Sequence, residues 1–326
     1  MKRRIFLAAG LAGCKRETTA LKEPIMVSVN RRPGMAGLYT AVEGGYFTAA
    51  GLPVALQTLS SGMEVVPLVA AGKIDVGFFP ANAAVFNAIA KGARIRMVAG
   101  REVLKPGCSD FGAIYGRPDV FPQGLTDLRQ LKGKVIATNG GLNINQFALD
   151  VLLDSVGLKL TDVSVKHMQP GDAITALRGK QIDALVAMHL YGPGIRERFP
   201  DWARHPGLVG LAPGFQYGYV YFGSRMLDLP VNVGGRFLAA YLRGTREYLG
   251  GKTPKFLDDV AKASGFEPEQ TKNFCREVAV EDGSVITESL RFYNEWAVKR
   301  GHCEKMVSIE QMMDMRFLEY ARKHPV

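Results

Sequence analysis

The pattern of hydrophobic and polar positions predicts the same order of strands and helices twice along the chain. Each copy begins with a short β-rich segment, Ile25–Val29 or Lys134–Thr138, which stops at turn residues. A helical pattern follows, then a second strand, a second helix and a third strand, Ile74–Phe79 or Ile182–Met188. These third strands are almost wholly apolar, which is typical of strands buried on both faces. Each copy is therefore predicted to form a β-α-β-α-β unit.

Five landmarks keep the two copies in register at a spacing of about 108 positions. The pairs are Asn30 and Asn139, Gly51 and Gly157, Gly62 and Gly171, Gly72 and Gly179, and Asp75 and Asp183. Right-handed crossovers between parallel strands then predict two three-layer α/β units. Ligands of such sheets bind beyond the carboxyl ends of the strands, so two facing units would build one cleft. We expect the recurrent Gly and Asp positions to have structural roles and not to contact a ligand. Asp75 is expected to order a turn.

Length and charge narrow the class of protein. The chain has 326 residues, 47% hydrophobic and 22% charged, which suits two folded domains. The formal net charge is +10, but no dense Lys/Arg block interleaved with aromatic residues occurs, so we expect no nucleic-acid partner. The basic surplus suits attraction for anions or for an anionic membrane surface. Beyond the N-terminus no apolar run is long enough to predict a membrane span.

The N-terminal segment, residues 1–14, predicts export. Its basic start, apolar run from Ile5 to Leu11 and final Cys14 form a short secretory signal. The ending LAGC resembles the lipobox of bacterial lipoproteins, which implies cleavage before Cys14 and lipidation of its thiol. Two or three acyl chains would anchor the protein stably to a membrane. The segment RRIFL also resembles a twin-arginine signal, so the export route stays open between the twin-arginine and general secretory pathways.

No motif for catalysis or metal binding is present. The G-x-S-x-G, H-E-x-x-H and P-loop patterns are absent, so we expect no enzyme, no cofactor and no metal. Cys108, Cys275 and Cys303 remain after export. Two of them could pair in an oxidising compartment, while inert buried thiols are the default, and the sequence leaves this open.

The segments GLYTAVEGGYFTAAGLPVAL, LVAAGKIDVGF, LTDLRQLKGKVIATNGG and ALRGKQIDALV together resemble type II periplasmic solute-binding proteins. The likeness is to the branch that serves nitrate, taurine, aliphatic sulfonates and thiamine pyrimidine precursors, and it covers about residues 25–225. It implies a two-lobed α/β fold with a mainly parallel sheet in each lobe, helices on the sheets and the ligand cleft between the lobes. We expect lobe 1 at 25–112 plus 219–326 and lobe 2 at 113–218.

The resemblance also implies a function. Such proteins capture a small solute outside the cytoplasmic membrane, in the periplasm or lipid-anchored on its outer face, and deliver it to the permease of an ABC transporter. The alternatives are an enzyme on the same fold, in pyrimidine-precursor or menaquinone-type metabolism, or a sensory binding protein. The export signal favours a binding protein over a cytosolic enzyme.

Candidate ligand contacts in lobe 1 lie in the loops after its strands. In the thiamine-precursor branch the first loop resembles Asn-x-x-His-Ala-Gly-x-Tyr, and Met35 stands where that His would be, which puts a formylaminopyrimidine ligand in doubt. Gly37 would let a helix start approach a ligand. Asn30 and the serines could equally cap turns or helices. The lobe 1 candidates are Asn30, Met35, Gly37, Tyr39, Ser60, Ser61, Phe79 and Asn82.

In lobe 2 the segment TNGGLN is the strongest candidate, because the exposed N–H groups at a helix start suit a carboxylate, sulfonate or phosphate. The alternating aromatic residues of FQYGYVYF should all point to one side of a strand, as hinge packing or as a wall of the cleft. Aromatic walls would suit a flat heterocyclic solute. The candidates are Thr138, Asn139, Gly140, Gly141, His189, Tyr191, Tyr217 and Tyr219.

Overall fold

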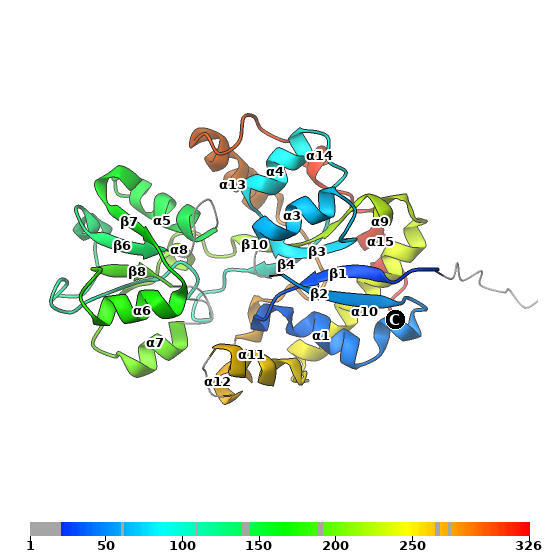
Figure 1. Cartoon of the computed structure of the whole chain (residues 1–326), viewed down its shortest axis with the longest axis horizontal. Coiled ribbons are helices and arrows are strands. Elements are labelled where there is room, and N and C mark those ends of the chain that lie inside the picture. The colour runs from blue at the N-terminus through cyan, green and yellow to red at the C-terminus, as the bar shows by residue number, and fades with distance from the viewer. Residues whose placement is uncertain are drawn as a thin grey trace, which may run out of the picture.

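The computed structural model describes residues 21–59, 62–108, 110–138, 144–187, 192–264, 268–272 and 275–326. The chain forms two α/β lobes joined by two crossing segments (Figure 1). We name residues 104–112 crossover 1 and residues 206–215 crossover 2. Within the described ranges no helix combines the length and hydrophobicity needed to cross a bilayer.

Lobe 1 opens with the first predicted unit and is completed by the C-terminal third of the chain. Its first part comprises β1 (Ile25–Val29), η1 (Pro33–Met35), α1 (Ala36–Glu43), α2 (Tyr46–Ala49), β2 (Val54–Thr58), α3 (Gly62–Ala70), β3 (Val76–Pro80), α4 (Ala83–Ala90) and β4 (Arg96–Val103). Its second part comprises β10 (Gln216–Phe222), α9 (Ser224–Asp228), α10 (Val231–Leu249), α11 (Phe256–Ser264), α12 (Pro268–Lys272), η4 (Arg276–Val278), α13 (Thr287–Lys299), α14 (Ile309–Met312) and α15 (Arg316–Lys323). Helices α1, α10 and α15 pack on one face of the sheet, and α3, α4 and α13 pack on the other.

Lobe 2 holds the second unit. It comprises β5 (Ile114–Gly116), η2 (Leu128–Leu131), β6 (Val135–Thr138), α5 (Ile144–Asp154), η3 (Leu160–Asp162), β7 (Ser164–His167), α6 (Pro170–Arg178), β8 (Ala184–Val186), α7 (Gly192–Arg198) and β9 (Ala203–His205), and α8 (Leu208–Leu211) follows in crossover 2. The strand orders are β2-β1-β3-β10-β4 in lobe 1 and β7-β6-β8-β5-β9 in lobe 2. The three strands of each predicted unit pair in parallel, and β10 and β5 enter as antiparallel strands.

The predicted repeat is confirmed, and the two recurrent aspartates make equivalent hydrogen bonds in the two lobes. Asp75 Oδ2 accepts hydrogen bonds from Met26 N at 2.8 Å and from Arg225 Nη1 at 2.8 Å. In lobe 2, Asp183 Oδ2 accepts from Val135 N at 2.9 Å, and its Oδ1 accepts from Arg117 Nη2 at 3.3 Å. Each carboxylate thus fastens the start of its third strand to the first strand of its unit and binds an arginine that follows the antiparallel strand. Asp75 orders its turn, as predicted.

The helix ends differ slightly between the copies. Gly72 adopts φ +70°, the left-handed conformation that suits glycine after a helix. In lobe 2 the corresponding Gly179 has φ −75°, and Lys180 adopts the left-handed conformation instead, with φ +59°. The extra turn residue agrees with the small drift in spacing between the two copies.

Strand β10 places the return to lobe 1 earlier than the expected boundary at residue 218. All of β10 belongs to the lobe 1 sheet, since Gln216 pairs with Val103 and Phe222 with Val76 and Arg96. Its side chains alternate as predicted: Tyr217, Tyr219 and Tyr221 pack into one core, and Val220 and Phe222 into the other. The second crossing therefore ends just before Gln216.

Candidate functional site

The carboxyl ends of the parallel strands in one lobe are directed at the other lobe. Strand β10 enters lobe 1 from crossover 2, and its Gly218 pairs antiparallel with Pro80 at the end of β3. In the same way β5 enters lobe 2 from crossover 1, and its first residue, Ile114, pairs with Val186 at the end of β8. The strand ends of both lobes therefore lie on the side of their lobe from which the crossovers leave (Figure 1). We use the name strand-end cleft for the region between these strand ends, where ligands of such sheets bind.

A buried ion pair lies under the lobe 1 side of this cleft. Arg101 Nη2 lies 2.5 Å from Glu102 Oε2, and Arg101 Nη1 donates to the Gly34 carbonyl oxygen at 3.1 Å. Neighbouring strand residues normally point to opposite faces, but a bulge changes this here. Glu102 pairs with Gly218 and Gly100 with Tyr219, so Arg101 has no partner on β10.

Two glycines make room for the Glu102 carboxylate. A Cβ atom on Gly34 would overlap Oε1, and one on Gly218 would lie 2.7 Å from Oε2. Sequence reasoning missed Arg101 and Glu102, although two charges after the uncharged run Met97–Gly100 of the same strand were a usable signal. The pair joins the loop after β1 to the start of β10, so it positions the loop that carries Asn30.

Asn30 is the expected contact that this geometry supports best. It follows β1 directly and is partly buried, and its Oδ1 atom is buried without a hydrogen-bond partner in the described structure. A buried acceptor without a partner is costly, and an N–H or O–H group of a ligand would satisfy it. Arg31 and Arg32, which follow it, are exposed and add positive charge to this loop.

Tyr217 and Thr138 also lie close to the strand-end cleft, and both side chains are buried. Tyr217 is 4% exposed, and its ring stacks on Phe111 of crossover 1 with centroids 4.7 Å apart. Burial, and next the Glu102 carboxylate, raise the pKa of Tyr217 well above its usual value, so the hydroxyl stays neutral. Thr138, at the end of β6, is buried and its Oγ1 lies 3.1 Å from His167 Nδ1.

Several expected contacts fall outside the described residues. They are Ser60, Ser61, Asn139, Gly140, Gly141, His189 and Tyr191, together with the lipidation site Cys14. They stay predictions.

The expectation for Met35 and Gly37 is corrected by helix packing. Met35 is fully buried in the core of lobe 1, with its Sδ 3.5 Å from Arg101 Nη1. Gly37 lies where α1 crosses α10: a Cβ atom there would lie 2.6 Å from Thr245 Oγ1. The glycine serves the close approach of two helices, and neither residue presents a surface to the strand-end cleft.

The aromatic expectations are corrected in the same way. Phe79 is 1% exposed and stacks on Tyr221, with ring centroids 3.9 Å apart. Tyr219 is fully buried and its hydroxyl donates to the Gln216 carbonyl oxygen at 2.8 Å. Tyr39 stacks on Phe256 of α11 at 3.6 Å. Each ring has an aromatic or backbone partner within the protein, so none of the three forms an open stacking wall.

Asn82 is a helix cap. Its Oδ1 accepts from Val85 N at 3.0 Å, and its Nδ2 donates to the Pro80 carbonyl oxygen at 3.1 Å. The side chain is 5% exposed. Both of its polar groups are therefore used within the turn that starts α4, and the expected hydrogen bond to a ligand is not supported.

A contact between the lobes that the sequence did not reveal lies beside the cleft. Asp150 of α5 is buried, and its Oδ2 accepts from Trp296 Nε1 at 2.6 Å and from Arg300 Nε at 2.5 Å. Phe147, one turn earlier, packs edge-on against Trp296, with centroids 5.1 Å apart. The lobes are thus joined at α5 and α13 as well as through the crossovers.

We predict that Asp150→Asn lowers the free energy of unfolding by about 2 kcal/mol, because a buried charge-assisted bond to Arg300 is lost. Asp154→Asn on the same helix is the matched control. Asp154 is 49% exposed, so its ion pair with Lys299 should contribute less than about 1 kcal/mol. Urea denaturation measures both, and equal losses would contradict the assigned role of Asp150.

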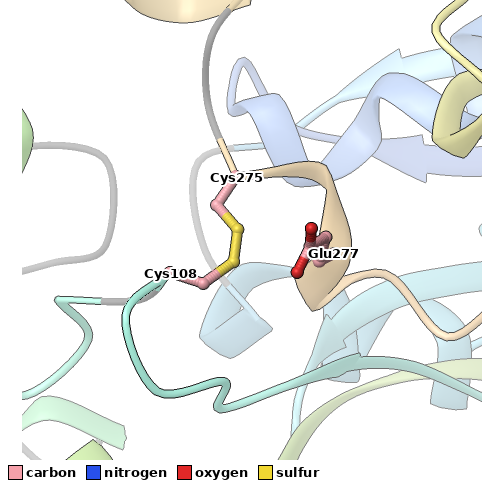
Figure 2. Close-up of side chains that lie close together, drawn as sticks. All are labelled: Cys108, Cys275 and Glu277. Atoms are coloured by element: carbon pink, nitrogen blue, oxygen red, sulfur yellow. A yellow bond between two sulfur atoms is a disulfide. The ribbon is translucent and has the colours of Figure 1, made fainter.

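Two of the three remaining cysteines pair. Cys108 of crossover 1 and Cys275, just before η4, form a disulfide with Cα atoms 5.5 Å apart. Figure 2 shows Glu277 beside this bond. The potential donor atoms of Cys108, Cys275 and Glu277 lie within 4.8 Å of one another. The disulfide uses both sulfur atoms, and Glu277 forms an ion pair with Lys105 at 3.0 Å. In this state the two cysteines therefore link crossover 1 covalently to the segment before η4.

Comparisons with known proteins agree with this architecture. Residues 32–192 match the family model described as NMT1/THI5 like. A curated Brucella abortus (strain 2308) protein, whose name calls it a candidate binding protein, is 31% identical over 215 residues. The match covers 65% of this chain and 61% of that protein. The chain thus spans about three fifths of the length of the curated relatives it matches.

Solved structures share the fold over nearly the whole chain. The periplasmic aliphatic sulphonate binding protein SsuA of Escherichia coli superposes with a TM-score of 0.71 at 16% identity, covering 90% of this chain and 93% of that one. The nitrate-binding protein NrtA of Synechocystis PCC 6803 gives a TM-score of 0.69 at 12% identity, covering 92% and 88%. The desulfurization enzyme DSZB, in complex with biphenyl-2-sulfinic acid, gives 0.66 at 14% identity, covering 92% and 99%.

The identities to these structures are too low to carry more than the fold. The ordered match across 32–192 and the paired sheets around one cleft agree with the resemblance seen in the sequence. Residues 32–192 are therefore similar to the NMT1/THI5-like family, and the chain shares the two-lobed α/β fold of the sulphonate- and nitrate-binding neighbours.

Proposed function

We propose that this chain is the extracytoplasmic solute-binding component of an ABC importer, which captures a small organic solute between two lobes that close on it. The observation that carries the proposal is the strand-end cleft, in which two matched β-α-β-α-β units face each other across a two-segment hinge. A ligand that bridges the lobes would favour the closed state by its difference in affinity for the two states. The sulphonate- and nitrate-binding neighbours support this interpretation.

The proposed solute is an organic anion. Phe79, Tyr219 and Tyr39 are engaged within the protein, which removes most of the support for a stacked heterocycle. The exposed Arg31 and Arg32 beside Asn30 favour a negatively charged group. Asn30 Oδ1 would accept a hydrogen bond from a polar N–H or O–H group of the same solute.

The proposal includes export and a lipid anchor at Cys14. The full-length protein expressed in bacteria should partition with membranes, and Cys14→Ser should release it, because the acyl chains provide the membrane affinity. Mass spectrometry of the processed N-terminus reads the acylation directly. An unmodified, uncleaved N-terminus would contradict this part of the proposal.

Native mass spectrometry of the chain expressed from Lys15 tests the binding function. Gentle purification should carry along a solute with a one-to-one mass increment, and its identification supplies a ligand for calorimetry and for X-ray scattering with and without it. Scattering profiles that superimpose would exclude lobe closure. A covalent adduct or a turnover product would contradict the binding-only function.

A pair of asparagine variants locates the site once that solute is known. Asn30→Ala should weaken its binding by about tenfold, the effect of one lost hydrogen bond. Asn232→Ala is the matched control, because its Oδ1 is also buried without a described partner but lies at the start of α10, beyond the far end of β10. Equal affinities of the two variants would place the solute elsewhere.

An enzyme on the same fold is the second candidate, favoured by the similarity to DSZB. The DSZB complex contains a form of that enzyme in which serine replaces one cysteine, which directs attention to the thiols of this chain. In the described part of this chain Cys303 is the free cysteine; it is buried, and burial raises its pKa to about 11. A thiol so protonated is a poor nucleophile.

We therefore predict that the chain from Lys15 shows no thiol reactive toward an aromatic disulfide reagent at neutral pH while folded. One reactive thiol should appear after unfolding without reductant, since Cys108 and Cys275 are paired. Cys303→Ala is the control and should show none in either state. Rapid modification of the folded protein would revive the enzyme hypothesis.

A further inference from the structure

A cavity of about 410 Å³ lies beside the two crossovers. Pro106–Cys108 of crossover 1 and Pro206 of crossover 2 form one part of its lining, and α7 and β9 of lobe 2 supply Arg196 and Arg204. A cavity of this size is large enough for a small organic molecule. Among the described residues, its lining contains none of Asn30, Thr138 or Tyr217, which lie close to the strand-end cleft.

Among the charged side chains that line this cavity, two are cations and one is an anion. Asp110, which is 3% exposed, accepts from Arg204 Nη2 at 2.5 Å and forms an ion pair with Arg196 Nη1. Two guanidinium groups thus share one carboxylate, which leaves a net charge of about one positive unit on the three side chains. The arginine side chains are 46% and 35% exposed, so they retain N–H groups that a molecule in the cavity can reach.

The positive charge of Arg204 adds to the effect of burial on two neighbouring groups. Burial lowers the pKa of Arg196, and the neighbouring Arg204 lowers it further. The pKa of His205 is lowered by the same two causes, burial first and Arg204 second. Another cation is disfavoured at this place, and an anion would relieve the repulsion.

We propose that this cavity is a binding site for an oxyanion, held by Arg196 and Arg204 and oriented by the Asp110 carboxylate between them. A guanidinium group presents paired N–H donors that match the two oxygens of a carboxylate, sulfonate or phosphate. The buried aspartate holds both arginines in place before the anion arrives, which reduces the entropy lost on binding. Because both crossovers line the cavity, an anion there contacts the segments about which the lobes move.

The oxyanion could be free in solution or be the acidic group of an organic molecule that fills the cavity. A free ion would use the two arginines alone. An organic anion would also contact the apolar lining at Pro106, Pro206 and Val209. Inorganic phosphate and benzenesulfonate separate the two sources, since only the second can use both parts of the cavity.

Isothermal titration of the wild-type chain with each probe, at constant ionic strength, tests the site. At least one probe should bind, and the double variant Arg196→Gln/Arg204→Gln should bind it at least about tenfold more weakly, the effect of one charge-assisted hydrogen bond. The matched control is Arg94→Gln/Arg129→Gln, which removes two exposed arginines that pair with Asp228 and Asp127 on the surface. It should bind as the wild type does.

Absence of binding by both probes would overturn the proposal, and so would an equal loss in the double variant and the control. The double variant leaves the buried Asp110 carboxylate without its two cations. If the double variant does not fold for this reason, Asp110→Asn is combined with it. Hydrogen exchange of the wild type is independent of any variant: the bound probe should slow exchange within residues 106–108, 110–112 and 203–210. Unchanged exchange at saturating probe would also overturn the proposal, whether or not the strand-end cleft binds a solute.

Discussion

Gly207→Ala is expected to lower the free energy of unfolding by about 3 kcal/mol or more, because two crossover segments touch at this residue. A Cβ atom on Gly207 would overlap the carbonyl group of Gly112, which belongs to the other crossover. Gly207 also has φ +68°, a conformation that alanine adopts only with strain. Backbone atoms cannot move aside as a flexible side chain can, so the crossovers would have to separate.

Gly214→Ala in crossover 2 is the matched control. Gly214 has φ +81°, but a Cβ atom there would meet no atom within 4 Å. Its substitution should cost about 1–2 kcal/mol, the conformational strain alone. Urea unfolding of both variants separates strain from overlap. Equal losses would show that the contact between Gly112 and Gly207 does not hold the hinge together.

Removal of the disulfide by Cys108→Ser/Cys275→Ser should lower the free energy of unfolding by about 2–5 kcal/mol. The two cysteines are 167 positions apart, and the chain between them includes all of lobe 2. A link across so long a segment strongly restricts the unfolded chain. In the folded protein it fastens crossover 1 to η4 of lobe 1 (Figure 2).

Thermal unfolding with and without a dithiol reductant checks this result. The reductant should lower the midpoint of the wild type toward that of the double variant and leave the variant unchanged. An equal response of both proteins to reductant would contradict a bond between Cys108 and Cys275.

The architecture was predictable because its signals are local. The periods of apolar residues marked the three strands of each unit, and the shared turn residues marked their ends. Strand β1 spans the expected Ile25–Val29, β3 (Val76–Pro80) overlaps the expected Ile74–Phe79, and β8 (Ala184–Val186) lies inside the expected Ile182–Met188. The recurrence of Asp75 and Asp183 has a physical cause, since each fastens the third strand of its unit to the first.

The candidate site was less predictable because alternation identifies a face but not what covers it. The aromatic residues of β10 do share one face, as expected. Phe79 and helix α13 cover that face, and neither contact is encoded near β10 in the chain. Gly37 was assigned to a ligand for the same reason: a glycine that admits a close neighbour does not reveal whether the neighbour is a solute or the α10 helix.

The pattern of apolar and turn residues was enough to predict the two β-α-β-α-β units, their order and the sheet edges beyond which ligands of such folds bind. The fold alone revealed the buried pair of Arg101 and Glu102, the pairing of Cys108 with Cys275, and the cluster of Asp110 with two arginines. Periodicity is set by each residue's nearest neighbours along the chain, and it survives in any arrangement of the lobes. A bulge, a disulfide or a shared carboxylate depends on which distant segments meet, and that follows from the packing of the whole chain.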